Sequence, residues 1–262
     1  MCTLLLVHRL EALSLAASGG TPEPFTLLAA NRDENTSRPA EGWAARRYGA
    51  RRAFAPRDVT LGGTWIGMND AGIVAAVTNR FGLPRDTSRH SRGEIVPGLL
   101  AHATVAAAAA WLSGLALADF NGFHALVFDR DRAIVAWPDG GALTLADVTG
   151  RCTVVSERSF GAARSLGEAG ERPERERWAA PAVAALAYGG VTRPEAWQQL
   201  LAEHREPTFE GPCVHWDIHE YGTRSSAIVT LAASRRGLVT TDGPPCRSPW
   251  TGRDDEVAAA LG

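Results

Sequence analysis

The chain has 262 residues, of which 45% are hydrophobic, and its 27 basic and 29 acidic residues leave a net charge of −2. This length supports a large core, and we expect a single domain over residues 1–262. All basic residues are arginine and they form no stripe that would neutralise phosphates, so nucleic acid is not an expected partner. The lack of lysine excludes a lysine base or Schiff base.

The four cysteines lie far apart and form no CxxC pair, which predicts neither a zinc ribbon nor a disulfide framework and favours a reducing cytoplasm. The apolar N-terminal run is broken by His8, Arg9 and Glu11 and is preceded by no basic region, so we interpret it as a strand of the mature protein. The alanine-rich stretch 99–120 has low hydrophobicity for a membrane span. We expect a packed helix there and no stable membrane insertion.

Hydrophobic periodicity and turn residues give a coarse order of elements. Strands are predicted at 3–8, 25–30, 64–68, 73–78, 123–128, 133–137, 142–148, 225–232 and 237–241. Helices are predicted at 95–118, 174–188, 192–204 and 255–261, the third opened by a capping box of Thr192 and Glu195. We expect a turn around 18–22, an arginine-rich loop at 46–58 and a glycine- and charge-rich loop at 158–177. Hairpins at both ends with helices in separate blocks predict an α+β protein with mainly antiparallel sheets covered by helices.

Cys2 is the first candidate for chemistry. If Met1 is removed, Cys2 becomes the N-terminus and carries both a thiol and a free α-amine. The pKa of an α-amine is about 7.7–8.0 and that of a thiol about 8.5, so the amine can accept the thiol proton at neutral pH. The alternative is a small apolar strand residue with no such role.

Polar residues end the second predicted strand in the segment AANRDEN. Asn31, Arg32, Asp33 and Glu34 follow one another there. Arg32 and Asp33 could lie beside Cys2, orient its ammonium and stabilise its thiolate. The alternative is a solvated strand end with internal ion pairs.

Two further segments place a polar side chain beside a buried strand. Asn79 ends the strand of GGTWIGMNDAGIVAAVTN, where its amide could donate to a developing oxyanion, or it could simply form a turn. Arg224 of YGTRSS precedes a buried strand and could face the same cleft, or it could be a surface arginine.

Taken together, these motifs resemble the NRDE family, also called the transport and Golgi organisation protein 2 family. The matching motifs are Cys2, AANRDE followed by SRP, GGTWIGMN with VTN, SRGEIV, NGFH and YGTRSS. That family is similar to the choloylglycine hydrolase and penicillin V acylase branch of the N-terminal nucleophile hydrolases. The resemblance implies a four-layer αββα sandwich, with two antiparallel sheets between helical layers and the cysteine at the start of a central strand.

Carried over residue by residue, the resemblance implies a cofactor-free amidase site. Cys2 would be nucleophile and base, Arg32 would lie next to the thiol, and Asp33 would hold the amine. Asn79 would sit in the oxyanion hole and Arg224 would close the cleft. The reaction would hydrolyse a linear amide through a thioester, on a small molecule with an apolar part.

The chain departs from the hydrolase branch at two places. Arg32 and Asp33 are adjacent instead of three residues apart, which leaves open whether Asp33 or Glu34 faces the amine. Glu157 stands where the family tends to have an amide donor, and a carboxylate cannot stabilise an oxyanion unless it is protonated.

The resemblance also carries a non-enzymatic alternative, a haem or acyl-CoA/lipid carrier. Its candidate haem ligands are Cys2 and the pair His215 and His219, with Cys213 nearby; otherwise these histidines form a cleft wall with Trp216. The remaining histidines are expected to be structural or solvent-facing: His8, His90, His102, His124 and His204.

Overall fold

The computed structural model describes residues 2–11, 24–81, 86–160, 174–189, 193–206, 208–232 and 235–262. The chain forms two compact units, each built around one antiparallel sheet. Unit 1 comprises Met1–Ser37, Thr149–Ser156 and Arg172–Asp254, and unit 2 comprises Arg38–Val148, Glu157–Glu171 and Asp255–Gly262. The α+β class is confirmed, and the single domain over residues 1–262 stays a prediction.

The sheet of unit 1 has the strand order β10-β1-β2-β12-β13-β14, with β11 paired to β12. Its strands are β1 (Cys2–Glu11), β2 (Pro24–Asn35), β10 (Cys152–Val155), β11 (His215–Trp216), β12 (Tyr221–Leu231), β13 (Arg236–Thr241) and β14 (Thr251–Gly252). The apolar runs of β1 and β2 are continuous because both strands are central and buried, as their exposures of 0 to 6% from Leu4 to Val7 and from Leu27 to Ala30 show.

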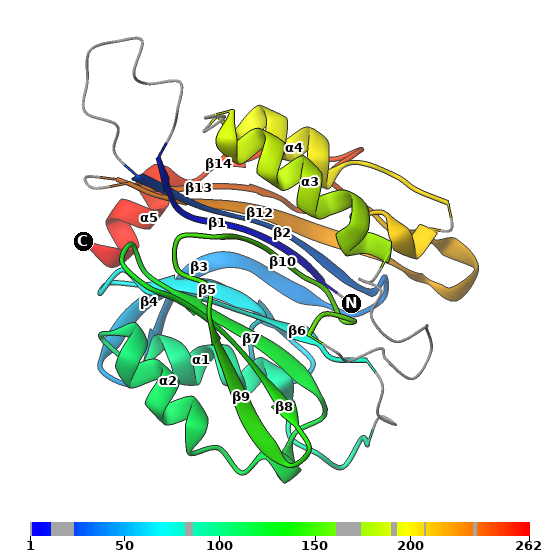
Figure 1. Ribbon diagram of the computed structural model, residues 1–262. Helices are drawn as coiled ribbons and strands as arrows, with labels where there is room; N and C mark the ends of the chain where they lie inside the picture. Colours follow the sequence, from blue (N-terminus) through cyan, green and yellow to red (C-terminus); the bar gives the residue numbers. More distant parts are fainter. Residues whose placement is uncertain are drawn as a thin grey trace, which may run out of the picture. The chain divides into compact units, whose positions relative to one another are not determined.

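Two helices cover one face of this sheet, α3 (Glu174–Tyr188) and α4 (Pro194–Leu201), and Figure 1 shows them side by side along it. Trp197 of α4 is fully buried in the core between these helices and the sheet. The shared core consists of Leu5, Val7, Leu27, Ala29, Val154, Ala179, Val183, Ala187, Trp197, Leu200, Leu201 and Ile228.

The sheet of unit 2 runs in chain order from β3 to β9. Its strands are β3 (Ala40–Tyr48), β4 (Arg51–Asp58), β5 (Ile66–Asn69), β6 (Val74–Asn79), β7 (Phe123–Phe128), β8 (Ala133–Asp139) and β9 (Ala142–Asp147). Helices α1 (Ile95–Leu100) and α2 (Val105–Ser113) pack on it through a second apolar core that includes Ile73, Leu99, Leu112 and Phe123. The chain ends in α5 (Asp254–Leu261), and short 3-10 turns lie at Arg92–Glu94, Leu117–Asp119, Thr208–Glu210 and Asp217–His219.

The predicted arginine-rich loop at 46–58 is wrong, because this segment belongs to the β3–β4 hairpin. Gly49 makes the connection with a φ of +56°, a conformation that glycine adopts without strain. The β4 strand buries Ala53 and Phe54 while Arg52 is exposed and Arg51 is partly so. The strand was not predicted because its arginines disguise the apolar pattern. Their long side chains reach solvent from the ends and the exposed positions of the strand.

The predicted helix over 95–118 is also wrong as a single element, because it is split between α1 and α2. The side-chain amide of Asn69 donates to the carbonyls of Leu100 and His102, at 2.9 and 2.8 Å, and so satisfies carbonyls at the end of α1. Thr104 then caps α2 by accepting a hydrogen bond from the amide of Ala107 at 3.2 Å. A side chain from another strand thus ends a helix that local propensity would continue.

Two of the sequence motifs meet in unit 2. The amide of Thr64 in GGTW donates to the carbonyl of Gly93 in SRGE at 2.9 Å. A Cβ on Gly63 would lie 2.4 Å from the carbonyl carbon of Gly93, so only glycine fits position 63.

Some sequence predictions lie outside the described residues. These are the turn around 18–22, Thr192 of the capping box and most of the loop at 158–177. Among the described residues, the helices are too short or too polar to cross a bilayer.

Candidate active site

Cys2 is the first residue of β1 and pairs with Arg32 of β2. The residue as a whole is half-buried. Burial raises the pKa of the Cys2 thiol above its usual value and the Asp33 carboxylate raises it further, while the charge of the N-terminal amine, Arg32 and a backbone hydrogen bond from Asp33 act in the opposite direction. A raised thiol pKa means that Cys2 needs a base to act as a nucleophile at neutral pH.

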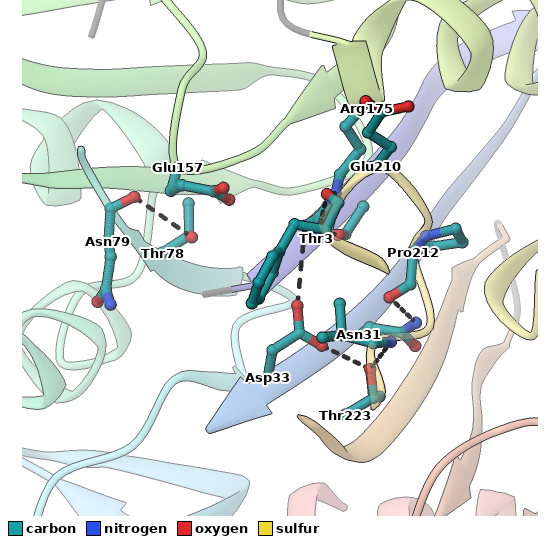
Figure 2. Close-up of polar contacts among 12 residues, drawn as sticks. Thr3, Asn31, Asp33, Thr78, Asn79, Glu157, Arg175, Glu210, Pro212 and Thr223 are labelled. Carbon is teal, nitrogen blue, oxygen red and sulfur yellow. Dashed lines mark hydrogen bonds and ion pairs between the residues drawn. The ribbon is translucent and has the colours of Figure 1, made fainter. Parts of the chain in front are cut away.

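The buried Asp33 carboxylate lies next along β2. Its side chain is fully shielded from solvent, and Thr223 of β12 donates its hydroxyl to Oδ1 over 2.6 Å. Arg175 places Nη1 3.7 Å from Oδ2, and the Tyr221 hydroxyl donates to the Asp33 carbonyl at 3.0 Å. Figure 2 shows Thr223 and Arg175 approaching the carboxylate from different elements. Asp33 is therefore fixed in place beside Cys2.

Arg175, in the first turn of α3, is a charged member of this network that the sequence reasoning missed. It is only 4% exposed and donates to the Thr3 hydroxyl at 2.8 Å and to the Phe209 carbonyl at 2.7 Å through Nη2. No motif marks it, because it lies in the charged run ERPERER with two other arginines. Its burial depends on how α3 packs on β1.

The adjacent residues of the NRDE segment have different surroundings. Glu34 is half-buried and its carboxylate accepts a hydrogen bond from the Asn35 amide at 2.9 Å. Of the two acids that the sequence left open, Asp33 is thus the one whose charge acts on the Cys2 thiol.

Asn31 is a structural member of the segment. Its amide donates to the carbonyls of Leu201 and Pro212 at 2.9 and 2.8 Å, and it accepts from the Ser226 hydroxyl at 2.6 Å. The contact with Pro212 is visible in Figure 2.

Arg32 and Arg224 both lie where β2 pairs with β12. Arg32 is 6% exposed and pairs with Ser225, and Arg224 is the extra residue of a β-bulge between Thr223 and Ser225. The half-buried Arg224 donates to the Asn35 carbonyl over 3.4 Å. A bulge redirects a side chain out of the regular alternation, which is why strand periodicity alone does not place Arg224.

Asn79 and Glu157 belong to unit 2. Asn79 ends β6 opposite Phe123 and is half-buried, and its carbonyl accepts from the Thr78 hydroxyl at 3.4 Å (Figure 2). Glu157 is 6% exposed, its carbonyl accepts from the Phe81 amide at 2.7 Å, and its carboxylate lies 4.0 Å from Arg158. That Asn79 acts as oxyanion donor to the Cys2 reaction stays a prediction.

The two histidines weighed as haem ligands have separate surroundings. His215 lies in β11 with its Nε2 3.5 Å from the Cys213 thiol, whereas His219 lies in a 3-10 turn and contacts Trp216, with ring centroids 3.7 Å apart and the rings tilted by 46°. Because the two rings sit on different elements, the four-residue spacing does not place them on one face. Instead, His215 joins Cys213, Cys246 and His204 in a cluster of potential metal ligands.

Three solved structures have a similar fold. Penicillin V acylase from Agrobacterium tumefaciens matches with 15% identity and a TM-score of 0.58, over 96% of this chain and 86% of that one. The N-acylethanolamine-hydrolyzing acid amidase ortholog of Caenorhabditis elegans matches with 12% identity and a TM-score of 0.58, over 87% and 92%. A variant of conjugated bile acid hydrolase from Clostridium perfringens matches with 12% identity and a TM-score of 0.56, over 96% of both chains.

These likenesses confirm the fold that the sequence motifs predicted, that of the N-terminal nucleophile hydrolases. No curated protein sequence matches the chain. The sequence profile of the family Transport and Golgi organisation 2 matches residues 16–164, more than half of the chain. With its motifs, its two antiparallel sheets and this match, the chain belongs to the Transport and Golgi organisation 2 family.

Proposed function

We propose that this protein is an N-terminal cysteine hydrolase that cleaves a linear amide bond. The observation that carries the proposal is the position of Cys2, which begins a central strand with Arg32 opposite and the buried Asp33 charge acting on its thiol. Removal of Met1 would free the α-amine at this place. The amine would then supply the base that the raised thiol pKa requires.

The chemistry follows from these groups. The α-amine of Cys2 takes the thiol proton, and the thiolate attacks the amide carbonyl to give a tetrahedral intermediate. The intermediate collapses to a thioester as the amine proton passes to the leaving nitrogen. Water, activated by the same α-amine, hydrolyses the thioester, so that one amide and one water yield a carboxylic acid and an amine.

Asp33 and Arg32 would have opposite electrostatic roles. The Asp33 carboxylate, fixed by Thr223 and Arg175, would hold the α-ammonium that forms when the thiol is deprotonated. Arg32 would stabilise the thiolate, in line with its lowering effect on the thiol pKa. On the family resemblance, we further propose Asn79 as an oxyanion donor and Arg224 as a residue that closes the cleft.

The proposed substrate class is a small amide with an apolar part. The three proteins of similar fold are named an acylase, an amidase and a hydrolase, of penicillin V, N-acylethanolamine and conjugated bile acid respectively. The shared fold and the Cys2 environment support an amide substrate of this general kind. The alternative carrier of haem or an acyl ligand would keep the fold and would not require the removal of Met1, and the separate placement of His215 and His219 gives it no support.

Intact mass spectrometry tests the proposal. The purified full-length protein is measured before and after a thiol-directed electrophile that mimics an amide, alongside Cys2→Ala and the control Cys152→Ala. We expect a mass without Met1 and a single adduct, lost in Cys2→Ala and kept in Cys152→Ala. Retention of Met1, or equal labelling of Cys2→Ala, would overturn the hydrolase mechanism; a positive result leads to a screen of acyl amides, with the released amine as the readout.

A further inference from the structure

Four side chains that can bind a metal ion meet near the N-terminal end of β12. His204 follows α4, Cys213 precedes β11 and His215 begins it. Cys246 lies in the turn after β13. Their donor atoms all lie within 4.8 Å of one another. All four residues belong to unit 1.

The three distances among Cys213, Cys246 and His215 match a tetrahedron, and the donor atom of His204 lies within 4.8 Å of all three. Zinc binds sulfur at about 2.3 Å and nitrogen at about 2.0–2.1 Å, so a tetrahedral ion separates two sulfurs by about 3.8 Å and a sulfur from a nitrogen by about 3.6 Å. The Cys213 and Cys246 sulfurs are 3.6 Å apart, and Nε2 of His215 lies 3.5 and 3.3 Å from them. The cysteines are both free, so the sulfurs are available to an ion.

The backbone around the cluster is held independently of any ion. The Cys213 amide donates to the Glu203 carbonyl at 3.2 Å, which ties the loop before β11 to the chain just before His204. At Gly211 a Cβ would lie 2.8 Å from the Arg205 amide nitrogen, so the two segments touch through backbone. The turn that carries Cys246 is closed by bonds from the Arg247 and Ser248 amides to the Pro244 carbonyl, at 3.1 and 2.9 Å. Ligands from three segments are therefore brought together before binding.

We propose that His204, Cys213, His215 and Cys246 form a structural Zn²⁺ site. Two thiolates and two imidazoles are a ligand set that zinc prefers, and four protein ligands leave no open position for a substrate. The site stands apart from the proposed hydrolase function and does not require it.

The proposed site is connected to the NRDE strand through hydrogen bonds between side chains of β2 and β12 and the backbone of Pro212 and Val214. Val214, next to Cys213 and His215, donates its amide to the Thr223 hydroxyl at 2.9 Å, and the same hydroxyl donates to Asp33. Asn31 binds the carbonyl of Pro212, which precedes Cys213. A bound ion would thus fix the segment against which the NRDE strand is anchored.

Elemental analysis tests the site on full-length protein made without a metal-affinity tag, in zinc-supplemented medium and with reductant throughout. We expect about one zinc per chain in the unchanged protein. The double variant His204→Asn/Cys246→Ser, whose residues are exposed or half-buried, should fold and lose at least tenfold in zinc content. Its matched control, His219→Asn/Cys152→Ser, should keep its zinc. Cobalt(II) added to the metal-free protein should give the charge-transfer and d–d bands of a tetrahedral thiolate site only in the unchanged and control proteins.

Three results would overturn the assignment. One is unchanged protein that carries no zinc and gives no cobalt spectrum under reductant. Another is a zinc content that the double variant and its control share. The third is a Cys213–Cys246 disulfide that persists in the reduced sample, which would make the pair a covalent link instead of a ligand set.

Discussion

Thr223 of β12 pairs directly with Asp33 of β2, and its hydroxyl donates to Oδ1 of Asp33 over 2.6 Å. The Thr223 hydroxyl oxygen also accepts a hydrogen bond from the amide of Val214 at 2.9 Å. A single hydroxyl therefore joins the acid beside Cys2 to the segment of β11, and it can do so only while β2, β12 and β11 are all paired.

Replacing Thr223 by valine keeps the shape of the side chain and removes both hydrogen bonds. We expect Thr223→Val to lower the free energy of unfolding by about 1–3 kcal/mol, because a buried carboxylate and a buried amide each lose a partner. The rate at which an electrophile modifies Cys2 should change as well, since Asp33 is no longer fixed. Urea unfolding and timed mass spectrometry measure the two effects. Thr230→Val, half-buried in the same strand, is the control, and equal losses in both variants would contradict the role given to Thr223.

Arg175 is the buried cation of the same network. Arg175→Met should destabilise the protein by about 3–5 kcal/mol, because it leaves the Asp33 charge without its ion pair in a buried place. The stability of Arg175→Lys should lie between those of the unchanged protein and Arg175→Met. Lysine keeps the charge but cannot contact both Thr3 and Phe209 with a planar group. The exposed Arg177, on the same helix, should tolerate methionine within about 0.5 kcal/mol. Denaturant unfolding midpoints measure the stability of each variant. An Arg175→Met protein as stable as Arg177→Met would show that the network is not essential to the fold.

His124 predicts a dependence of stability on pH. It is fully buried in β7 with Nε2 3.0 Å from the Ser159 carbonyl, and burial lowers its pKa to about 4. The unfolded chain, with a histidine pKa of about 6.5, takes up the proton first as the pH falls, so the unfolded state binds more protons between the two values. The contribution of His124 to stability is therefore complete above pH 6.5 and is lost as the pH falls towards 4.

The size of this effect follows from the two pKa values. Between pH 7 and pH 5 the free energy of unfolding should fall by about 2 kcal/mol more in the unchanged protein than in His124→Gln. Urea titrations at the two pH values measure the difference. The exposed His90, changed to glutamine, should reproduce the unchanged protein, and a His124→Gln curve with the same slope would refute the assignment.

Gly98 in α1 is set by a close contact with α2. A Cβ at this position would lie 1.9 Å from Cη2 of Trp111, closer than any side chain allows. Alanine favours a helix by about 1 kcal/mol over glycine, yet we expect Gly98→Ala to cost about 1–3 kcal/mol because the helices must move apart. Combined with Trp111→Leu, the two losses should be less than additive. Gly42→Ala in β3, with open space at its Cβ, is the control, and an increase in stability for Gly98→Ala would show that the two helices separate freely.

The predictable parts of the fold are those fixed by local pattern. The apolar runs at 3–8, 25–30 and 73–78 predicted strands, and the strands β1, β2 and β6 confirm it. The strands β3 and β4 were missed because their arginines conceal the alternation, and the break between α1 and α2 was missed because its cause, Asn69, comes from a distant strand.

The candidate site divides in the same way. Cys2, Arg32 and Asp33 could be proposed from the sequence because they begin and end apolar runs that pair as neighbouring antiparallel strands. Arg175 could not, because its place depends on helix packing. Of the four residues in the metal-ligand cluster, the sequence pointed to Cys213 and His215 as possible ligands and missed His204 and Cys246. These two come from separate segments, and only the return of β13 beside β12 brings Cys246 to the others.

Asn31, the first letter of the NRDE motif, points its amide at two main-chain carbonyls, those of Leu201 and Pro212, and away from any reacting group described for the site. In a mutational scan, changes at Asn31 should therefore reduce the cellular abundance of the protein, whereas changes at Cys2 should leave abundance intact. Variants of the motif residues would then fall into two classes, those that lower abundance and those that lower activity alone. Measuring both quantities for each variant would tell the classes apart.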